Sequence, residues 1–232
     1  MDRTSMNRIG ALSGLVAAVT FFATFIATGN SPKTSATAAT IATFYKNHVT
    51  DIEISQLLLF IFAFALLIYA AFLWDRFRHA MSTDTSLATL VLIGGALAVV
   101  VTLIQNGVEM VLTMEPVQTV DSGIAGMYGL SQQLYLIMLF SFAVFLGVVA
   151  LAALETRALP TWLAWITATL SVAMFIFEAY AIFHPNANNG GIGGLLFIVF
   201  MLWLIVSSIY CARSTWRVKA PMTASPPAPA MD

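Results

Sequence analysis

The sequence predicts an all-α membrane protein: a bundle of six transmembrane helices with both termini in the cytoplasm. Composition is the first observation. The chain has 232 residues, of which 59% are hydrophobic and 9% charged, and its mean hydropathy is +0.88. Soluble domains are about 45–50% apolar and about 25% charged. So much apolar surface requires lipid as its solvent.

Six apolar stretches are the second observation. A membrane-spanning helix needs about 20 mostly apolar residues to cross a hydrocarbon core about 30 Å thick. Six segments satisfy this requirement, at residues 9–28, 54–74, 87–107, 130–154, 162–183 and 192–212. We therefore predict one multi-pass domain over residues 1–218. Residues 219–232, which are rich in proline, are expected to form a disordered cytoplasmic tail.

The distribution of basic residues is the third observation. With a cytoplasmic N-terminus, only Lys33 and Lys46 face outward. The remaining basic residues all face inward: Arg3, Arg8, Arg76, Arg78, Arg157, Arg213, Arg217 and Lys219. This bias follows the positive-inside rule, and because removing any one span would break it, it supports the count of six.

The first span also has features of a signal peptide, because basic residues precede it and small residues follow it. Its apolar stretch is longer than the 7–15 residues that are typical of a signal core. We interpret it as a retained membrane anchor.

Two outer connections carry local structure signals. The segment 35–47 is rich in alanine and threonine, and its apolar residues Ile41, Phe44 and Tyr45 occur at nearly helical spacing. This pattern predicts a short helix on the outer membrane surface, with Ser35 as its N-cap. In the connection 108–129, the glycines predict a flexible or tightly turned loop, at Gly123, Gly126 and Gly129.

Glu178 is the clearest candidate functional residue, because an ionisable group within a membrane span is costly and marks a functional site by default. Gln105, Glu109 and Gln133 lie near the same predicted depth. Together the four residues predict a polar, ligand-binding pocket in the outer half of the bundle. The alternative is a purely structural role, with these side chains hydrogen-bonded between helices or reaching the headgroup zone.

Other kinds of site have weaker support. A metal site would have to combine His48 or His184 with carboxylates, and no close ligand spacing of the His-x-x-x-His kind occurs, so no metal is predicted. We find no nucleophile, base and orienting group that could form a catalytic set, and we predict neither catalytic residues nor a cofactor. The single cysteine, Cys211, cannot form an intramolecular disulfide.

Gly10 and Gly14 form a Gly-x-x-x-Gly motif at the start of the first span. Such a motif lets two helices approach closely. It is compatible with packing inside the chain, the commoner use, and with a dimer of two chains.

Three stretches resemble a family of uncharacterised bacterial membrane proteins common in actinobacteria: residues 37–47, residues 70–78 and residues 157–165. The resemblance, together with the helix count, covers nearly the whole chain. It implies a six-helix protein of a bacterial plasma membrane, and it implies no activity.

The hypothesis we favour is a non-enzymatic membrane protein that binds a small amphipathic ligand, a lipid or a partner protein in its outer half. The first alternative is a proton-coupled transporter that uses Glu178, and the second is a membrane enzyme. Membrane lipids are expected partners. Nucleic acid is not expected, because the net charge is -1.

Overall fold

The computed structural model describes residues 3–28, 31–33, 35–81, 85–114, 121–184 and 192–217, and every regular element in them is a helix. Six of these helices are long and apolar enough to cross a membrane, which confirms the predicted all-α membrane bundle. The helices are α1 (Arg3–Thr28), α2 (Ala38–Asn47), α3 (Val49–Ala80), α4 (Ser86–Leu112), α6 (Asp121–Thr156), α7 (Thr161–Phe183) and α8 (Ile192–Arg217).

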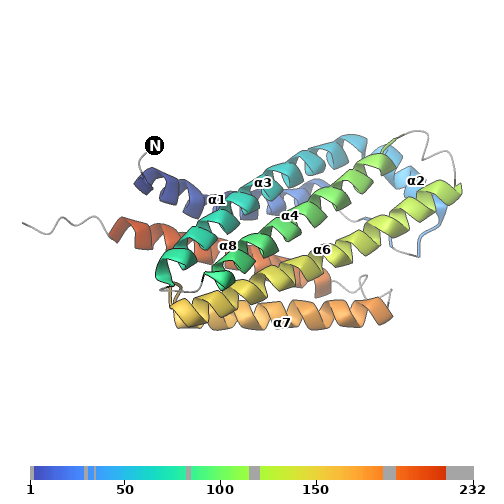
Figure 1. The fold of residues 1–232 in the computed structure, drawn as a ribbon. Helices are drawn as coiled ribbons and strands as arrows, with labels where there is room; N and C mark the ends of the chain where they lie inside the picture. Colours follow the sequence, from blue (N-terminus) through green and yellow to red (C-terminus); the bar gives the residue numbers. More distant parts are fainter. Residues whose placement is uncertain are drawn as a thin grey trace, which may run out of the picture.

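The six long helices form an elongated bundle (Figure 1) in which each packs beside its neighbour in the chain. Helix α8 returns to pack against α1, and its smaller contact with α7 completes a ring of helices. The start of α1, the end of α8 and the α3–α4 and α6–α7 connections lie at one end, here called the inner end. Helix α2 lies at the opposite, outer end.

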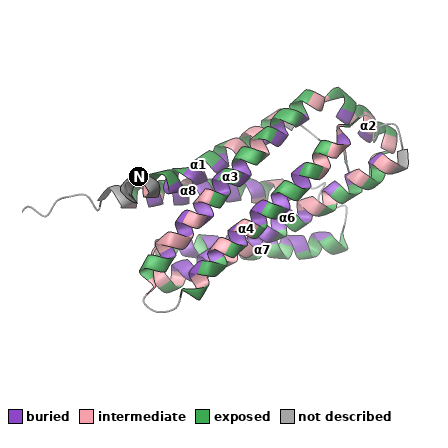
Figure 2. Cartoon of the chain, turned by 45° about the horizontal axis from the view of Figure 1, so that its top comes forward, coloured by how far each residue is buried: buried purple, intermediate pink, exposed green. Residues whose placement is uncertain are grey.

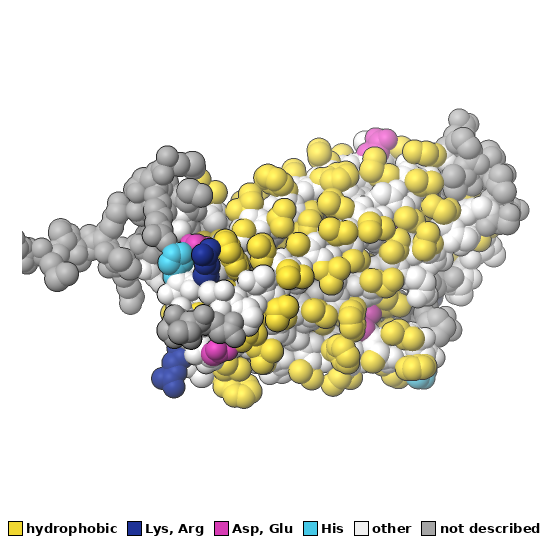
Figure 3. Space-filling view, viewed as in Figure 1, with side chains coloured by type: hydrophobic (Ala, Val, Ile, Leu, Met, Phe, Trp, Pro, Cys, Tyr) yellow, Lys and Arg dark blue, Asp and Glu magenta, His cyan; other side chains and the backbone are white. Residues whose placement is uncertain are grey.

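The outside of the bundle is apolar, as a membrane-facing surface must be. Figure 2 shows exposed residues along the outward faces of the helices and buried residues along the inward faces. In Figure 3, hydrophobic side chains cover the middle of the visible face, whereas the visible basic side chains lie near one end. Because lipid offers the backbone no hydrogen bonds, helices are the structures that can carry such a surface.

Aromatic rings fill the centre of the bundle and join helices that are distant in sequence. Phe197 of α8 stacks on Phe21 of α1, with ring centroids 4.7 Å apart, and lies 5.7 Å from Phe142 of α6. Trp203, also on α8, donates a hydrogen bond from Nε1 to the Thr167 hydroxyl of α7 over 2.7 Å. This buried bond reinforces the contact between α7 and α8, the smaller one in the ring.

Small residues allow α1 to pack closely against α3. A Cβ atom at Gly10 would lie 2.7 Å from Cβ of Phe72, and one at Gly14 would lie 2.8 Å from a ring carbon of Tyr69. The Gly10–Gly14 motif therefore packs inside this chain. Without side chains at these positions, the two helix backbones can approach each other.

Replacing Gly10 by alanine should destabilise the bundle by about 1–3 kcal/mol, because the added methyl group overpacks the contact with Phe72. The matched control is Gly107→Ala on α4, where an added Cβ has no atom within 4 Å. Thermal unfolding of both purified variants in one detergent tests this. Equal melting temperatures for the two variants would contradict the packing role.

Helix α2 confirms the predicted helix in the first outer connection. Its N-cap residue and the contacts that it makes differ from the prediction. Thr37, not Ser35, is the N-cap, and its hydroxyl accepts a hydrogen bond from the Thr40 N–H over 3.3 Å. The prediction of Ser35 was wrong because several residues in this segment can cap a helix. Ile41 and Tyr45 are buried in a small cluster with residues of α3, α4 and α6, so α2 also packs on the bundle itself.

The predicted glycine loop in the connection 108–129 was wrong. Gly123, Gly126 and Gly129 all lie inside α6, which begins at Asp121 instead of near Leu130. The helix continues past the apolar stretch because its backbone groups bond to one another, and glycine is tolerated in membrane helices. The predicted tail over 219–232 and the Asn/Gly-rich turn before α8 lie outside the described residues.

Candidate functional site

Glu178 lies on α7, in the outer half of the bundle, and only 2% of its surface is exposed. Its Oε1 atom is buried and has no hydrogen-bond partner in the described part of the chain. Tyr135 of α6 lies close enough to Glu178 for the two groups to interact electrostatically. A buried carboxyl oxygen without a partner is costly, so this position is suited to accept a hydrogen bond from a bound molecule.

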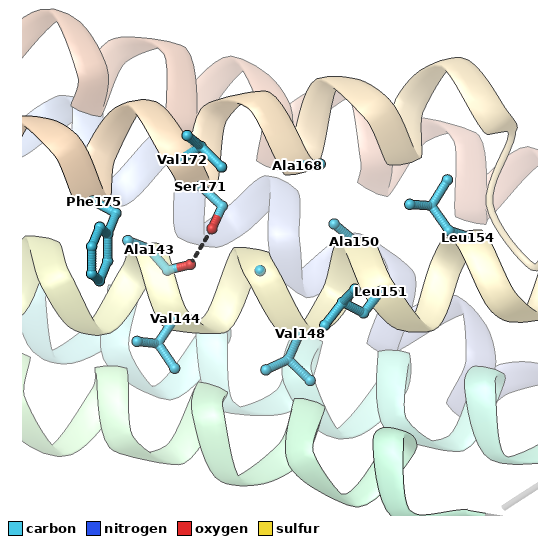
Figure 4. A pocket seen from close by; sticks show the side chains of 11 residues that line it. Ala143, Val144, Val148, Ala150, Leu151, Leu154, Ala168, Ser171, Val172 and Phe175 are labelled. Carbon is cyan, nitrogen blue, oxygen red and sulfur yellow. Dashed lines mark hydrogen bonds between the residues drawn. The ribbon is translucent and has the colours of Figure 1, made fainter.

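A groove between α6 and α7 lies on the same side of α7 as Glu178. Its volume is about 480 Å³, which is within the range of about 300–1,000 Å³ for small-molecule pockets. Figure 4 shows its walls, which are formed by α6 and α7 alone. The only hydroxyl in the lining, that of Ser171, already donates to the Ala143 carbonyl oxygen over 2.7 Å. The groove therefore offers apolar contacts and no free polar group.

Two aromatic rings close the end of the groove toward Glu178. Phe175 of α7 lies at this end in Figure 4, and its ring centroid is 5.3 Å from that of Phe140 on α6. Ser171 and Glu178 are two helical turns apart, so their side chains project from nearly the same face of α7, with Phe175 between them. The contact line between α6 and α7, here called the seam, thus has an apolar groove and then, closer to the outer end of the bundle, a carboxyl group.

Glu109 has its hydrogen bonds satisfied, in contrast to Glu178. The Tyr45 hydroxyl donates to its Oε2 over 2.6 Å, and the Ser131 hydroxyl donates to its Oε1. The carboxyl group therefore joins α4 to both α2 and α6. Burial raises the pKa of the Tyr45 phenol, and the nearby Glu109 carboxylate raises it further, so Tyr45 stays protonated and continues to donate.

Tyr45→Phe should lower the free energy of unfolding by about 1–3 kcal/mol, because it leaves one oxygen of Glu109 without its donor. Tyr180→Phe on the exposed face of α7 is the control, since it removes the same hydroxyl group without a buried partner. Limited proteolysis of the outer connections together with thermal unfolding measures the effect. If both variants behaved as wild type, Glu109 would not fasten α2 to the bundle.

The four predicted site residues do not form one pocket. Glu109 and Glu178 lie on α4 and α7, and α6 packs between these helices. Gln133 is exposed on α6, and Gln105 is buried on α4. Glu178 therefore remains as the predicted residue with an unsatisfied buried group.

A second pair of polar residues lies beside Gln105, and sequence analysis did not select it as a site. Asn106 of α4 donates from Nδ2 to the Gln56 carbonyl oxygen of α3 over 3.3 Å. The side-chain oxygens Asn106 Oδ1 and Gln56 Oε1 are both buried without a partner. Both oxygens, like Glu178 Oε1, are therefore acceptors without a donor in the described part of the chain.

Arg76 forms the polar contacts of the inner end, and its importance also escaped sequence analysis. Its Nε and Nη2 donate to the Ala158 carbonyl oxygen over 3.2 and 2.9 Å, and Nη1 donates to the Ser214 hydroxyl over 2.9 Å. Helix α6 ends where Arg157 adopts a left-handed backbone with φ of 53°. This conformation helps the α6–α7 turn present the Ala158 carbonyl group to α3.

The fold and the surface define the class of this protein: an all-α, multi-pass membrane protein with six membrane-spanning helices. A comparison with protein families, with curated proteins and with solved structures finds no match for the chain.

Glu178→Met should stabilise the protein in the absence of a ligand by about 1–3 kcal/mol, because methionine replaces an unsatisfied polar group with an apolar side chain of similar length. The measurement is thermal unfolding of delipidated protein in detergent. A loss of stability would instead indicate that Glu178 has partners inside the chain, and the site would then be structural.

Proposed function

We propose that this protein binds a small amphipathic molecule of the membrane, with Glu178 as the group that anchors the polar head. One observation carries the proposal: Glu178 Oε1 is buried within a candidate membrane span and lacks a partner. An ionisable residue inside the membrane lowers the stability of the protein, and a bound ligand that forms a hydrogen bond with it would offset that loss.

The chemistry of the head follows from the carboxyl group. A carboxylate only accepts hydrogen bonds, and a protonated carboxyl group still accepts through its carbonyl oxygen. The head must therefore carry a donor, such as a hydroxyl or an amine. Because Glu178 lies well inside the outer end of α7, the rest of the molecule must be compatible with hydrocarbon.

Other features of the site support binding rather than catalysis. The groove beside α7 is lined by apolar side chains and by Ser171, whose proton is bonded to the Ala143 carbonyl oxygen. The second carboxyl group of the outer half, Glu109, is occupied by Tyr45 and Ser131. Glu178 thus acts as a single recognition group, and the protein functions as a membrane receptor or carrier for an amphiphile.

The test is mass spectrometry of protein extracted from its native membrane in lipid-preserving particles. Wild type should carry a stoichiometric amphiphile that Glu178→Met loses, because methionine has no oxygen that can accept a hydrogen bond from the head. The control is Glu155→Met, the same substitution at an exposed position at the end of α6. If all three proteins carried only bulk lipid, or the same amphiphile equally, Glu178 would not anchor a ligand.

A further inference from the structure

We infer that the groove between α6 and α7 holds the hydrocarbon tail of the same ligand, and that the ligand is a single-chain amphiphile with a donor head, such as a long-chain alcohol or amine. This inference rests on the proposed function and specifies its substrate class. It is carried by the position of Glu178, which lies two helical turns beyond Ser171 of the groove on nearly the same face of α7.

The shape of the groove favours one extended chain. Two helices packed side by side lie about 8–10 Å apart, so a groove between them is narrow and follows their axes. The groove exists because its floor is made of small residues on both helices: Ala143, Gly147, Ala150 and Ala168. A Cβ atom at Gly147 would lie 3.0 Å from the Ser171 hydroxyl oxygen, so α6 and α7 are in close contact beneath it.

The polarity of the seam sets the orientation of the ligand. Ser171 offers no free donor to a bound molecule, because its proton is committed to the Ala143 carbonyl group. Glu178 has the unpartnered acceptor beyond the outer end of the groove. The head therefore points outward to Glu178, and the tail runs along α6 and α7 toward the inner end.

Phe175 and Phe140 separate the two parts of the site, and both can move. Their side chains are 50% and 41% exposed on the membrane-facing surface, and their rings contact each other rather than the central aromatic core. An outward rotation of Phe175 connects the groove to Glu178 without disturbing buried residues. The two rings thus act as a cover over the junction of head and tail.

The experiment uses photo-crosslinking in vesicles of phosphatidylcholine that contain the full-length protein. The probe is octadecanol with a diazirine in the middle of its chain, and its methyl ether, which has no donor, is the matched probe. We expect crosslinks to peptides within residues 143–154 and 168–175. The methyl ether and Glu178→Met should each lower the yield by about five-fold or more, as the loss of a buried hydrogen bond implies.

Two variants of α7 test whether the tail of the probe lies in the groove. Ala168→Leu fills it and should lower the yield by about five-fold or more, because a leucine side chain occupies the path of the tail. Thr169→Leu, at an exposed position about 100° around α7 from Ala168, should leave the yield unchanged. Val148→Phe fills the groove from α6 and serves as a second test if Ala168→Leu does not fold.

Each outcome separates this inference from the proposed function. Crosslinks outside the groove, or a yield that neither groove-filling variant lowers, would overturn the tail site even where Glu178→Met releases the native amphiphile. Groove crosslinks that are equally strong for the methyl ether and in Glu178→Met would overturn the link between groove and head. The expected pattern requires both losses together, with Thr169→Leu unchanged.

Discussion

The structure depends on one constraint: inside a bilayer, every backbone polar group must find its partner within the protein. Backbone groups meet this constraint in the helices, and several buried hydroxyl groups are bonded locally as well, as when Thr102 and Ser141 donate to carbonyl groups of the preceding turn. The longer-range bonds determine which helices are joined. Trp203 to Thr167 joins α8 to α7, and Tyr69 to Ser207 joins α3 to α8 over 2.8 Å.

The same constraint explains why the two carboxyl groups of the outer half have different roles. Glu109 is held by two hydroxyl donors and fixes α2 to the bundle. Glu178 has an oxygen that the described residues leave unbonded. A satisfied buried polar group stabilises one structure, whereas an unsatisfied one is costly. Under the proposed function, this unsatisfied oxygen of Glu178 is the group that a ligand would bind.

How much could be predicted from the sequence depended on how local each signal is. The six spans follow from apolar length alone, and the short helix α2 follows from the spacing of Ile41 and Tyr45. The grouping of Glu109 with Glu178 did not follow, because the donors to Glu109 come from Tyr45 and Ser131, on two other helices. Hydrogen bonds between distant segments leave no periodic pattern.

The groove was not predictable for a related reason. Alanine and glycine at 143, 147, 150 and 168 are ordinary in a membrane helix, and they create a hollow only because α6 and α7 pack with these residues facing each other. Similarly, Arg76 counted only as an inner basic residue, since its acceptors lie on the α6–α7 turn and on α8.

The ring of helices also has a consequence for biosynthesis. Each long helix up to α7 packs beside one that has already been made, so these pairs can form in order as the chain emerges. Helix α8 is different, because it must return to α1, the first helix synthesised. Until it arrives, Phe21 lacks its stacking partner and the Tyr69 hydroxyl lacks its acceptor. Ring closure is therefore the step that completes the buried contacts of α1 and α3.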